Sequence, residues 1–177
     1  MESAFSDTIP LAPFGTDQET ETMNIDMGLD QQQRETMAKA VTALLADTYA
    51  LYFKTHAYHW NVTGPRFHDL HAMFMEQYTE LWTAVDDIAE RIRALGVLAP
   101  ISYDEMAKAA SIAPDASTPD ADTMVRNLVA GHEQVVRTAR AALALASEHG
   151  DEATSDLVAP RITAHEKFAW MLRVTVA

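Results

Sequence analysis

A long apolar stripe between residues 67 and 95 constrains the fold more than any other feature of the sequence. Its members recur at alternating steps of three and four, which is the spacing of the buried face of an α-helix. The stripe consists of Phe67, Leu70, Phe74, Tyr78, Leu81, Val85, Ile88, Ile92 and Leu95. The sequence therefore predicts a long amphipathic helix that buries this face against other helices.

Side chains that can bind metal lie one position further round the same helix. They share this face with two large apolar residues, and in order the set is His71, Met75, Trp82, Asp86 and Glu90. Asp86 and Glu90 are four residues apart, so they project side by side and could hold one cation between them. His59 ends the preceding helix, and the break at Gly64-Pro65 can bring it back towards His71. The pattern predicts two half-sites, one of two imidazoles and one of two carboxylates.

These two half-sites cannot meet within one chain. His71 and Asp86 lie fifteen residues apart on one helix, which is about 22 Å along its axis. A two-fold-related partner lying antiparallel would place its own imidazole pair opposite this chain's carboxylate pair. The spacing therefore predicts at least a dimer, with a mixed nitrogen and oxygen site at its interface. Such ligands suit iron, zinc or manganese, and a carboxylate-rich site in a helical bundle favours iron.

A simpler interpretation exists for each of these residues. A single histidine beside an apolar stripe is usually a core or capping residue. Asp86 and Glu90 could instead form ion pairs with Arg91 or Arg93 on a solvated face. The order His, His, Asp, Glu across two helices is more specific than any one residue, but spacing alone leaves both interpretations open.

Several longer motifs follow one another along the chain. They are KTHAYHWNVTGPRFHDLH, EQYTEL, DDIAERIRALG, GDEATSDL and HEKFAWMLR. In this order they closely resemble the Dps family, the ferritin-like DNA-binding proteins from starved cells, over residues 30–174. The resemblance implies an all-α ferritin-like four-helix bundle and a hollow shell of twelve subunits. Carried over by position, the iron ligands would be His59 and His71 from one subunit with Asp86 and Glu90 from the other.

The resemblance also implies a function. Fe(II) would be oxidised, chiefly by hydrogen peroxide or else by oxygen. Ferric mineral would then form on the acidic inner wall of the homododecamer. Weaker candidates for side chains that nucleate this mineral are Glu76, Glu80 and Asp87. Such a ferroxidase stores iron and protects the cell against oxidative stress. In Dps shells the start of the last helix surrounds three-fold pores through which iron enters, so Glu152 and Asp156 are candidates for a pore lining. Without the resemblance, acidic residues there would simply complement the helix dipole.

One position departs from the Dps pattern. The family usually has a carboxylate four residues after the second histidine, where this chain has Met75. Glu76 points about 100° away on a helix and is a poor substitute. A thioether is a soft, uncharged ligand that hard iron does not favour. We therefore expect the first iron position to survive and the second to be weakened.

Start and stop signals predict four long helices and one short helix. In order, the expected elements are helices over about 30–62 and 67–95, a crossover at 97–118 that contains the short helix, and helices over about 119–149 and 151–174. A capping box from Ser102 to Glu105 starts the short helix. Pro119 is expected at the first position of the third long helix and Gly150 at its end, and Pro160 is expected to kink the fourth.

Composition limits the remaining possibilities. The 177 residues suit one domain at 30–177 after an irregular acidic tail at 1–29, and the absence of cysteine excludes disulfides and thiolate metal sites. No apolar run is long enough for a membrane span, so we expect a cytoplasmic protein. A net charge of −13 without basic tails makes DNA binding unlikely. Two alternatives to a ferroxidase that stores iron remain. One is a nucleoid or DNA-binding structural protein, and the other is a metal-buffering shell with an impaired ferroxidase centre.

Overall fold

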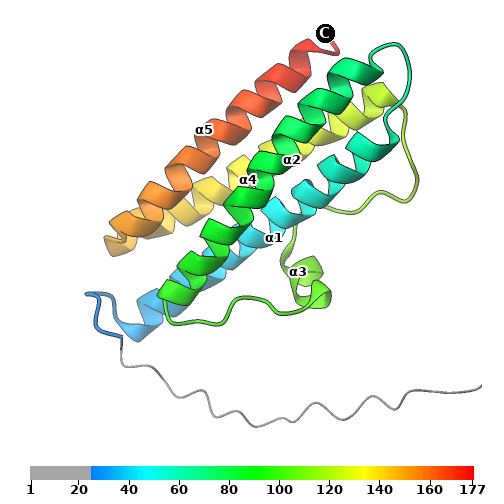
Figure 1. Ribbon diagram of the computed structural model, residues 1–177. Helices are drawn as coiled ribbons and strands as arrows, with labels where there is room; N and C mark the ends of the chain where they lie inside the picture. Colours follow the sequence, from blue (N-terminus) through cyan, green and yellow to red (C-terminus); the bar gives the residue numbers. More distant parts are fainter. Residues whose placement is uncertain (1–24) are drawn as a thin grey trace, which may run out of the picture.

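The computed structural model describes residues 25–177, which form five α-helices and no strands. The helices are α1 (Gln31–Asn61), α2 (Phe67–Ala94), α3 (Tyr103–Ala109), α4 (Ala121–His149) and α5 (Glu152–Val174) (Figure 1). The predicted all-α architecture is confirmed. The predicted tail at 1–29 lies outside the described residues up to residue 24, and its boundary with the bundle domain stays a prediction.

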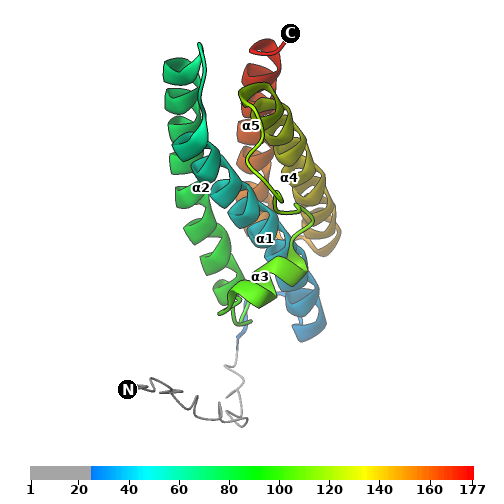
Figure 2. The same ribbon diagram turned by 90° about the vertical axis from the view of Figure 1, so that its right-hand side faces the viewer.

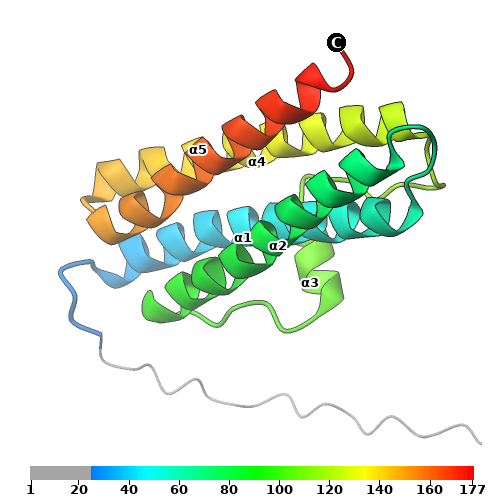
Figure 3. The same ribbon diagram turned by 45° about the horizontal axis from the view of Figure 1, so that its top comes forward.

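Four long helices form a bundle of two antiparallel pairs. Helix α1 packs on α2, and α4 packs on α5. Seen from the side, the pairs lie next to each other, and α1 also contacts α4 (Figure 2). Helices α2 and α4 run in the same direction, so the crossover returns along the bundle and carries α3 on the outer side of α1 (Figure 3). The predicted long crossover with a short helix is therefore confirmed.

The core is built from the stripes that the sequence predicts. In α2, the side chains of Phe74, Leu81 and Ile88 are completely buried. Phe67 is the exception, with 46% of its surface exposed, because it is the first residue of its helix and faces away from the bundle.

In the part of the chain that the structure describes, no helix is apolar over enough of its length to cross a membrane.

Helix ends agree with the predictions at three positions and differ at one. Ser102 caps α3 by accepting from the Glu105 N–H, and Gly150 ends α4 in the left-handed conformation at φ 66°. The prediction that Pro119 is the first residue of the third long helix is wrong. The Asp120 carboxylate accepts from the Thr123 N–H at 2.8 Å and is the N-cap, so α4 begins two residues after the proline. Gly96 also follows α2 with positive φ, and α5 continues through Pro160.

A buried carboxylate holds the crossover against the bundle. Asp47 on α1 is completely buried. Its Oδ1 accepts from the backbone N–H of Ser111 at 2.5 Å and of Ile112 at 3.2 Å, and its Oδ2 accepts from the Thr138 hydroxyl at 2.6 Å. One side chain thus joins α1, the crossover and α4, which fixes the path of the chain after α3.

A polar cluster interrupts the apolar core between α2, α4 and α5. His132 and His165 are completely buried, and their Nδ1 atoms lie 2.9 Å apart. His132 Nε2 lies 3.2 Å from Gln77 Oε1, and Glu80 pairs with Arg161 beside them at 2.5 Å. Within residues 25–177, every buried side-chain polar atom that lacks a hydrogen-bond partner belongs to this cluster.

The two buried histidines are neutral in the folded protein. Burial and then the charge of Arg161 lower the pKa of His132 to about 3. Burial, His132 and Arg161 together lower the pKa of His165 well below its usual value of 6.5. The carboxylate of Glu80 and the guanidinium of Arg161 offset each other and the two imidazoles are neutral, so the cluster has no excess negative charge to attract a metal cation, and it is a structural feature of the core.

Acidification is expected to destabilise the fold through this histidine pair. An unfolded histidine titrates near 6.5, so the pair's contribution to stability is complete above pH 6.5 and is lost as pH falls from 6.5 towards about 3. Each histidine can lower the free energy of unfolding by up to about 1.4 kcal/mol per pH unit in that window. Urea unfolding at fixed subunit concentration and several pH values measures the slope.

The double substitution His132→Gln, His165→Gln should flatten this pH dependence. His68→Gln is the matched control, because that side chain is 96% exposed. A double variant with the wild-type slope would contradict the assignment. If the double variant does not fold, the histidine ring resonances of the wild-type protein decide the question, because a neutral buried pair does not titrate in this window.

Candidate metal centre

The imidazoles of His59 and His71 face each other at the end of the α1–α2 pair where the turn joins the two helices. The turn between the helices contains Gly64 at φ 102°, a left-handed conformation that side chains rarely adopt. This turn places the last turn of α1 beside the second turn of α2. The predicted return of His59 towards His71 is confirmed.

Each of the two imidazoles is hydrogen-bonded to the other residue's backbone. His59 Nδ1 lies 2.8 Å from the carbonyl oxygen of His71, and His71 Nδ1 lies 2.9 Å from the carbonyl oxygen of His59. A carbonyl oxygen can only accept, so both Nδ1 atoms carry the proton. In the neutral imidazole this tautomer keeps a lone pair on Nε2, which is the form that binds a metal ion.

The two rings are stacked, with their centroids 3.7 Å apart and their planes at 21°. The Nε2 lone pair lies in the plane of its ring, so an ion in the plane of one ring lies outside the plane of the other. The pair is therefore suited to two neighbouring metal positions and not to one shared ion.

The carboxylates of Asp86 and Glu90 are exposed on α2, one turn apart. Among residues 25–177, neither takes part in an ion pair. Arg91 pairs instead with Asp151 at 2.7 Å, and Arg93 donates to the carbonyl of Val97 at 3.0 Å. The interpretation that these arginines neutralise the carboxylate pair is therefore wrong, and the pair is available to a cation.

Imidazole and carboxylate pairs remain apart within one subunit. Across residues 25–177, no three His, Asp or Glu side chains come together as a metal site. Each pair thus supplies only half of a ligand set, as the fifteen-residue spacing of His71 and Asp86 requires.

The face that carries both pairs also exposes several large apolar side chains. Between 46% and 59% of the surface is exposed at Trp60, Phe67, Met75 and Trp82. So many exposed aromatic rings on one face of two helices indicate a surface that is covered by another protein molecule.

His56 is a third imidazole beside this site, and its role is packing. Its ring stacks on Tyr78 at 4.0 Å, and its Nδ1 lies 3.3 Å from the Tyr52 hydroxyl. Burial and then the neighbouring His59 lower its pKa, so His56 is uncharged at neutral pH. It supports the wall of the site. The sequence showed no signal for this stacking because Tyr78 belongs to the inward stripe.

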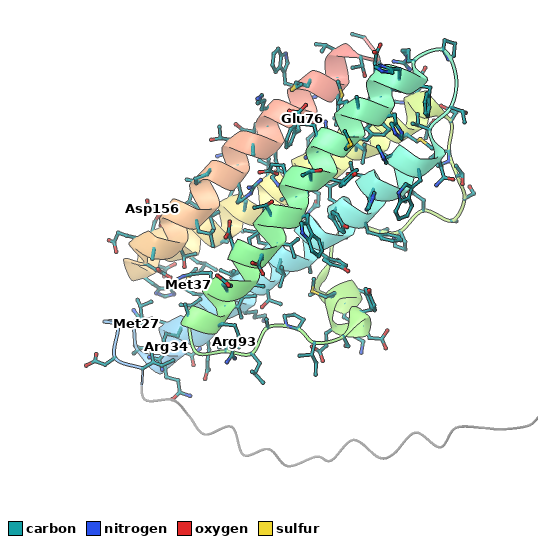
Figure 4. All side chains as sticks on the ribbon, in the orientation of Figure 1. Met27, Arg34, Met37, Glu76, Arg93 and Asp156 are labelled. Atoms are coloured by element: carbon teal, nitrogen blue, oxygen red, sulfur yellow. The ribbon has the colours of Figure 1, made fainter. Side chains whose placement is uncertain are left out.

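The acidic cluster at the start of α5 separates into two kinds of residue. Asp151 is buried and caps α5 by accepting from Thr154, and it also pairs with Arg91. Burial alone would raise the pKa of Asp151, but hydrogen bonds from Thr154 and Arg91 hold it below its usual value. Glu152 and Asp156 are exposed instead. Figure 4 labels Asp156 on α5 and another exposed carboxylate, Glu76, on α2.

Known proteins resemble this chain over most of its length. Residues 38–177 match the family described as ferritin-like domain. An uncharacterized low temperature-induced protein of Nostoc sp. is 38% identical over 151 residues, which is 84% of each chain. DNA protection during starvation protein 2 of Bacillus anthracis is 37% identical over 82% of this chain and 97% of that protein. The crystal structure of a DPS protein from Vibrio cholerae O1, described as a ferritin-like diiron-carboxylate protein, has a TM-score of 0.81 at 36% identity, covering 87% of this chain and all of that one.

Proposed function

The chain belongs to the ferritin-like family, and within it to the Dps proteins, and from this premise we propose that it is a ferroxidase that oxidises Fe(II) and stores the ferric product inside a hollow homododecamer. The ferritin-like four-helix bundle expected from the sequence is confirmed by the same similarities. Iron storage and protection against stress are the general functions that they support. The oxidant, the shell of twelve and the ligands are our proposal for this chain.

The observation that carries the proposal is the reciprocally bonded imidazole pair of His59 and His71. Its Nε2 lone pairs are fixed in the metal-binding tautomer on a face rich in exposed aromatic rings. Across a two-fold axis, Asp86 and Glu90 of the partner subunit would complete the ligand set. Imidazole nitrogen with carboxylate oxygen is a set that binds Fe(II) and stabilises the harder Fe(III) after oxidation.

Two Fe(II) ions match the electron count of the proposed oxidant. Reduction of one hydrogen peroxide to two waters takes two electrons and two protons. Two Fe(II) ions supply one electron each and become Fe(III). One Fe(II) held by His59 and the carboxylates, and a second Fe(II) that binds only weakly beside it during turnover, can therefore reduce peroxide together without releasing hydroxyl radical, which is how such a protein would protect a cell. Oxygen is the alternative oxidant.

Acidic side chains away from the centre would guide iron in and hold the product. Glu152 and Asp156 are the proposed lining of the pore through which iron enters, since both are exposed one turn apart on α5. Of the three candidates for the mineral wall, Glu80 pairs with Arg161, whereas Glu76 and Asp87 are exposed. Glu76 and Asp87 are therefore the better candidates for nucleating ferric mineral.

Replacement of Asp86 tests the ferroxidase directly. Asp86→Asn keeps the size of the side chain but removes a charged iron ligand, so the initial rate of Fe(II) oxidation should fall by about tenfold to a hundredfold. Iron is added anaerobically to the apoprotein, and peroxide or air is then introduced separately while ferric absorbance is followed. Asp104→Asn, at an exposed carboxylate on α3, is the control for loss of charge alone.

An Asp86→Asn variant that oxidises iron as fast as the wild type would refute this centre. The favoured function would then be a metal-buffering shell whose ferroxidase centre is impaired. Equal oxidation in the presence and absence of protein would lead to the same conclusion.

The rival function is a structural one, the compaction of DNA. The charge of −13 per chain argues against it, because a shell of many such chains repels phosphate. We expect no retardation of duplex DNA in a mobility-shift assay at low salt without divalent cations. Retention under those conditions would favour the DNA-binding function, whereas retention only with added magnesium would indicate bridging by the metal.

A further inference from the structure

Met75 places a soft ligand beside one of the two imidazoles. It lies one helical turn after His71 on α2, and 48% of its surface is exposed. Residues four apart on a helix have Cβ atoms about 5–6 Å from each other, so an imidazole and a thioether there can reach one ion. The chain has no cysteine, and methionine sulfur is therefore its softest metal ligand.

We propose that the position formed by His71 and Met75 binds copper(I). The inference rests on the proposed function, because it assigns a second kind of metal ion to the same interfacial site. Thioether and neutral imidazole are ligands that select Cu(I), whereas carboxylate oxygen suits Fe(III). Neither His71 nor Met75 adds negative charge, so together they match a soft monovalent cation better than a trivalent one.

The stacked rings separate the copper position from the iron position. Because the rings of His59 and His71 are nearly parallel, each directs its lone pair to its own ion. His59 with the carboxylates of a second subunit forms the harder, charged position. His71 with Met75 forms the softer, uncharged one. The site thus discriminates between metals by ligand type within a few ångströms.

Apolar neighbours of the second position favour the same ion. The ring of Phe67 lies 5.0 Å from that of His71, one turn earlier on α2. Trp82 is exposed further along the same face as Met75. Low polarity around a metal position disfavours a highly charged ion, since its lost hydration is not replaced.

A competition experiment on the full-length assembled protein tests the proposal. Under anaerobic conditions, Cu(I) is titrated against the chromophoric chelator bicinchoninate, and copper-edge X-ray absorption identifies the neighbouring atoms. Met75→Leu keeps the apolar volume but removes the sulfur. We expect it to weaken Cu(I) binding about tenfold or more and to remove the sulfur neighbour. Met27→Leu, at another exposed methionine, is the matched control and should change neither result.

A second variant makes the result independent of packing. Met75→Glu should also lose Cu(I) affinity, and it should gain affinity for Fe(II) because it supplies a carboxylate at the second position. Equal Cu(I) affinity in the wild type and Met75→Leu, or copper without a sulfur neighbour in the wild type, would overturn the proposal.

Iron oxidation measured on the same preparations separates the two claims. If Asp86→Asn abolishes oxidation but Met75→Leu leaves Cu(I) binding unchanged, the copper assignment alone fails. If Cu(I) binding depends on Met75 but Asp86→Asn oxidises iron normally, the ferroxidase alone fails.

Discussion

The exchange of hydrogen bonds between His59 and His71 is the interaction on which the rest of the metal centre depends. Each imidazole donates to the other residue's carbonyl, so the ends of two helices that pack on each other are also linked by a pair of side-chain-to-backbone hydrogen bonds. The same two bonds fix both rings in one tautomer and orient their free Nε2 atoms. Folding of the α1–α2 hairpin therefore also orients the two imidazoles that we propose as metal ligands.

The geometry of a straight helix makes the centre a property of the assembly. Helix α2 presents its apolar stripe to the core and its metal-binding residues to the outside, and no bend brings His71 to Asp86. In our proposal, two copies related by symmetry overcome this separation by exchanging half-sites. The exposed aromatic rings on the same face supply the apolar surface that such an association buries.

Regular features could be predicted from the sequence, and contacts between distant residues could not. The stripe from Phe67 to Leu95 fixed the position of α2 because helical periodicity is a local property. The start of α4 was misplaced at Pro119, since the stronger capping group is the Asp120 carboxylate. Neither the stacked imidazoles nor the pairing of Arg91 with Asp151 has a local signal. The ligand set itself stays a prediction, because a single chain holds only its halves.

A subunit-mixing measurement tests most directly whether the centre is shared between chains. One variant carries His59→Gln and His71→Gln, the other carries Asp86→Asn and Glu90→Gln, and each alone should lack an intact site. In a randomly mixed assembly, half of the dimers are mixed and each has one intact site of two, so about one quarter of the wild-type iron-oxidising sites should return. Recovery near that level would establish the shared centre. A mixed assembly as inactive as its parents would show that the four residues do not form one site across the interface.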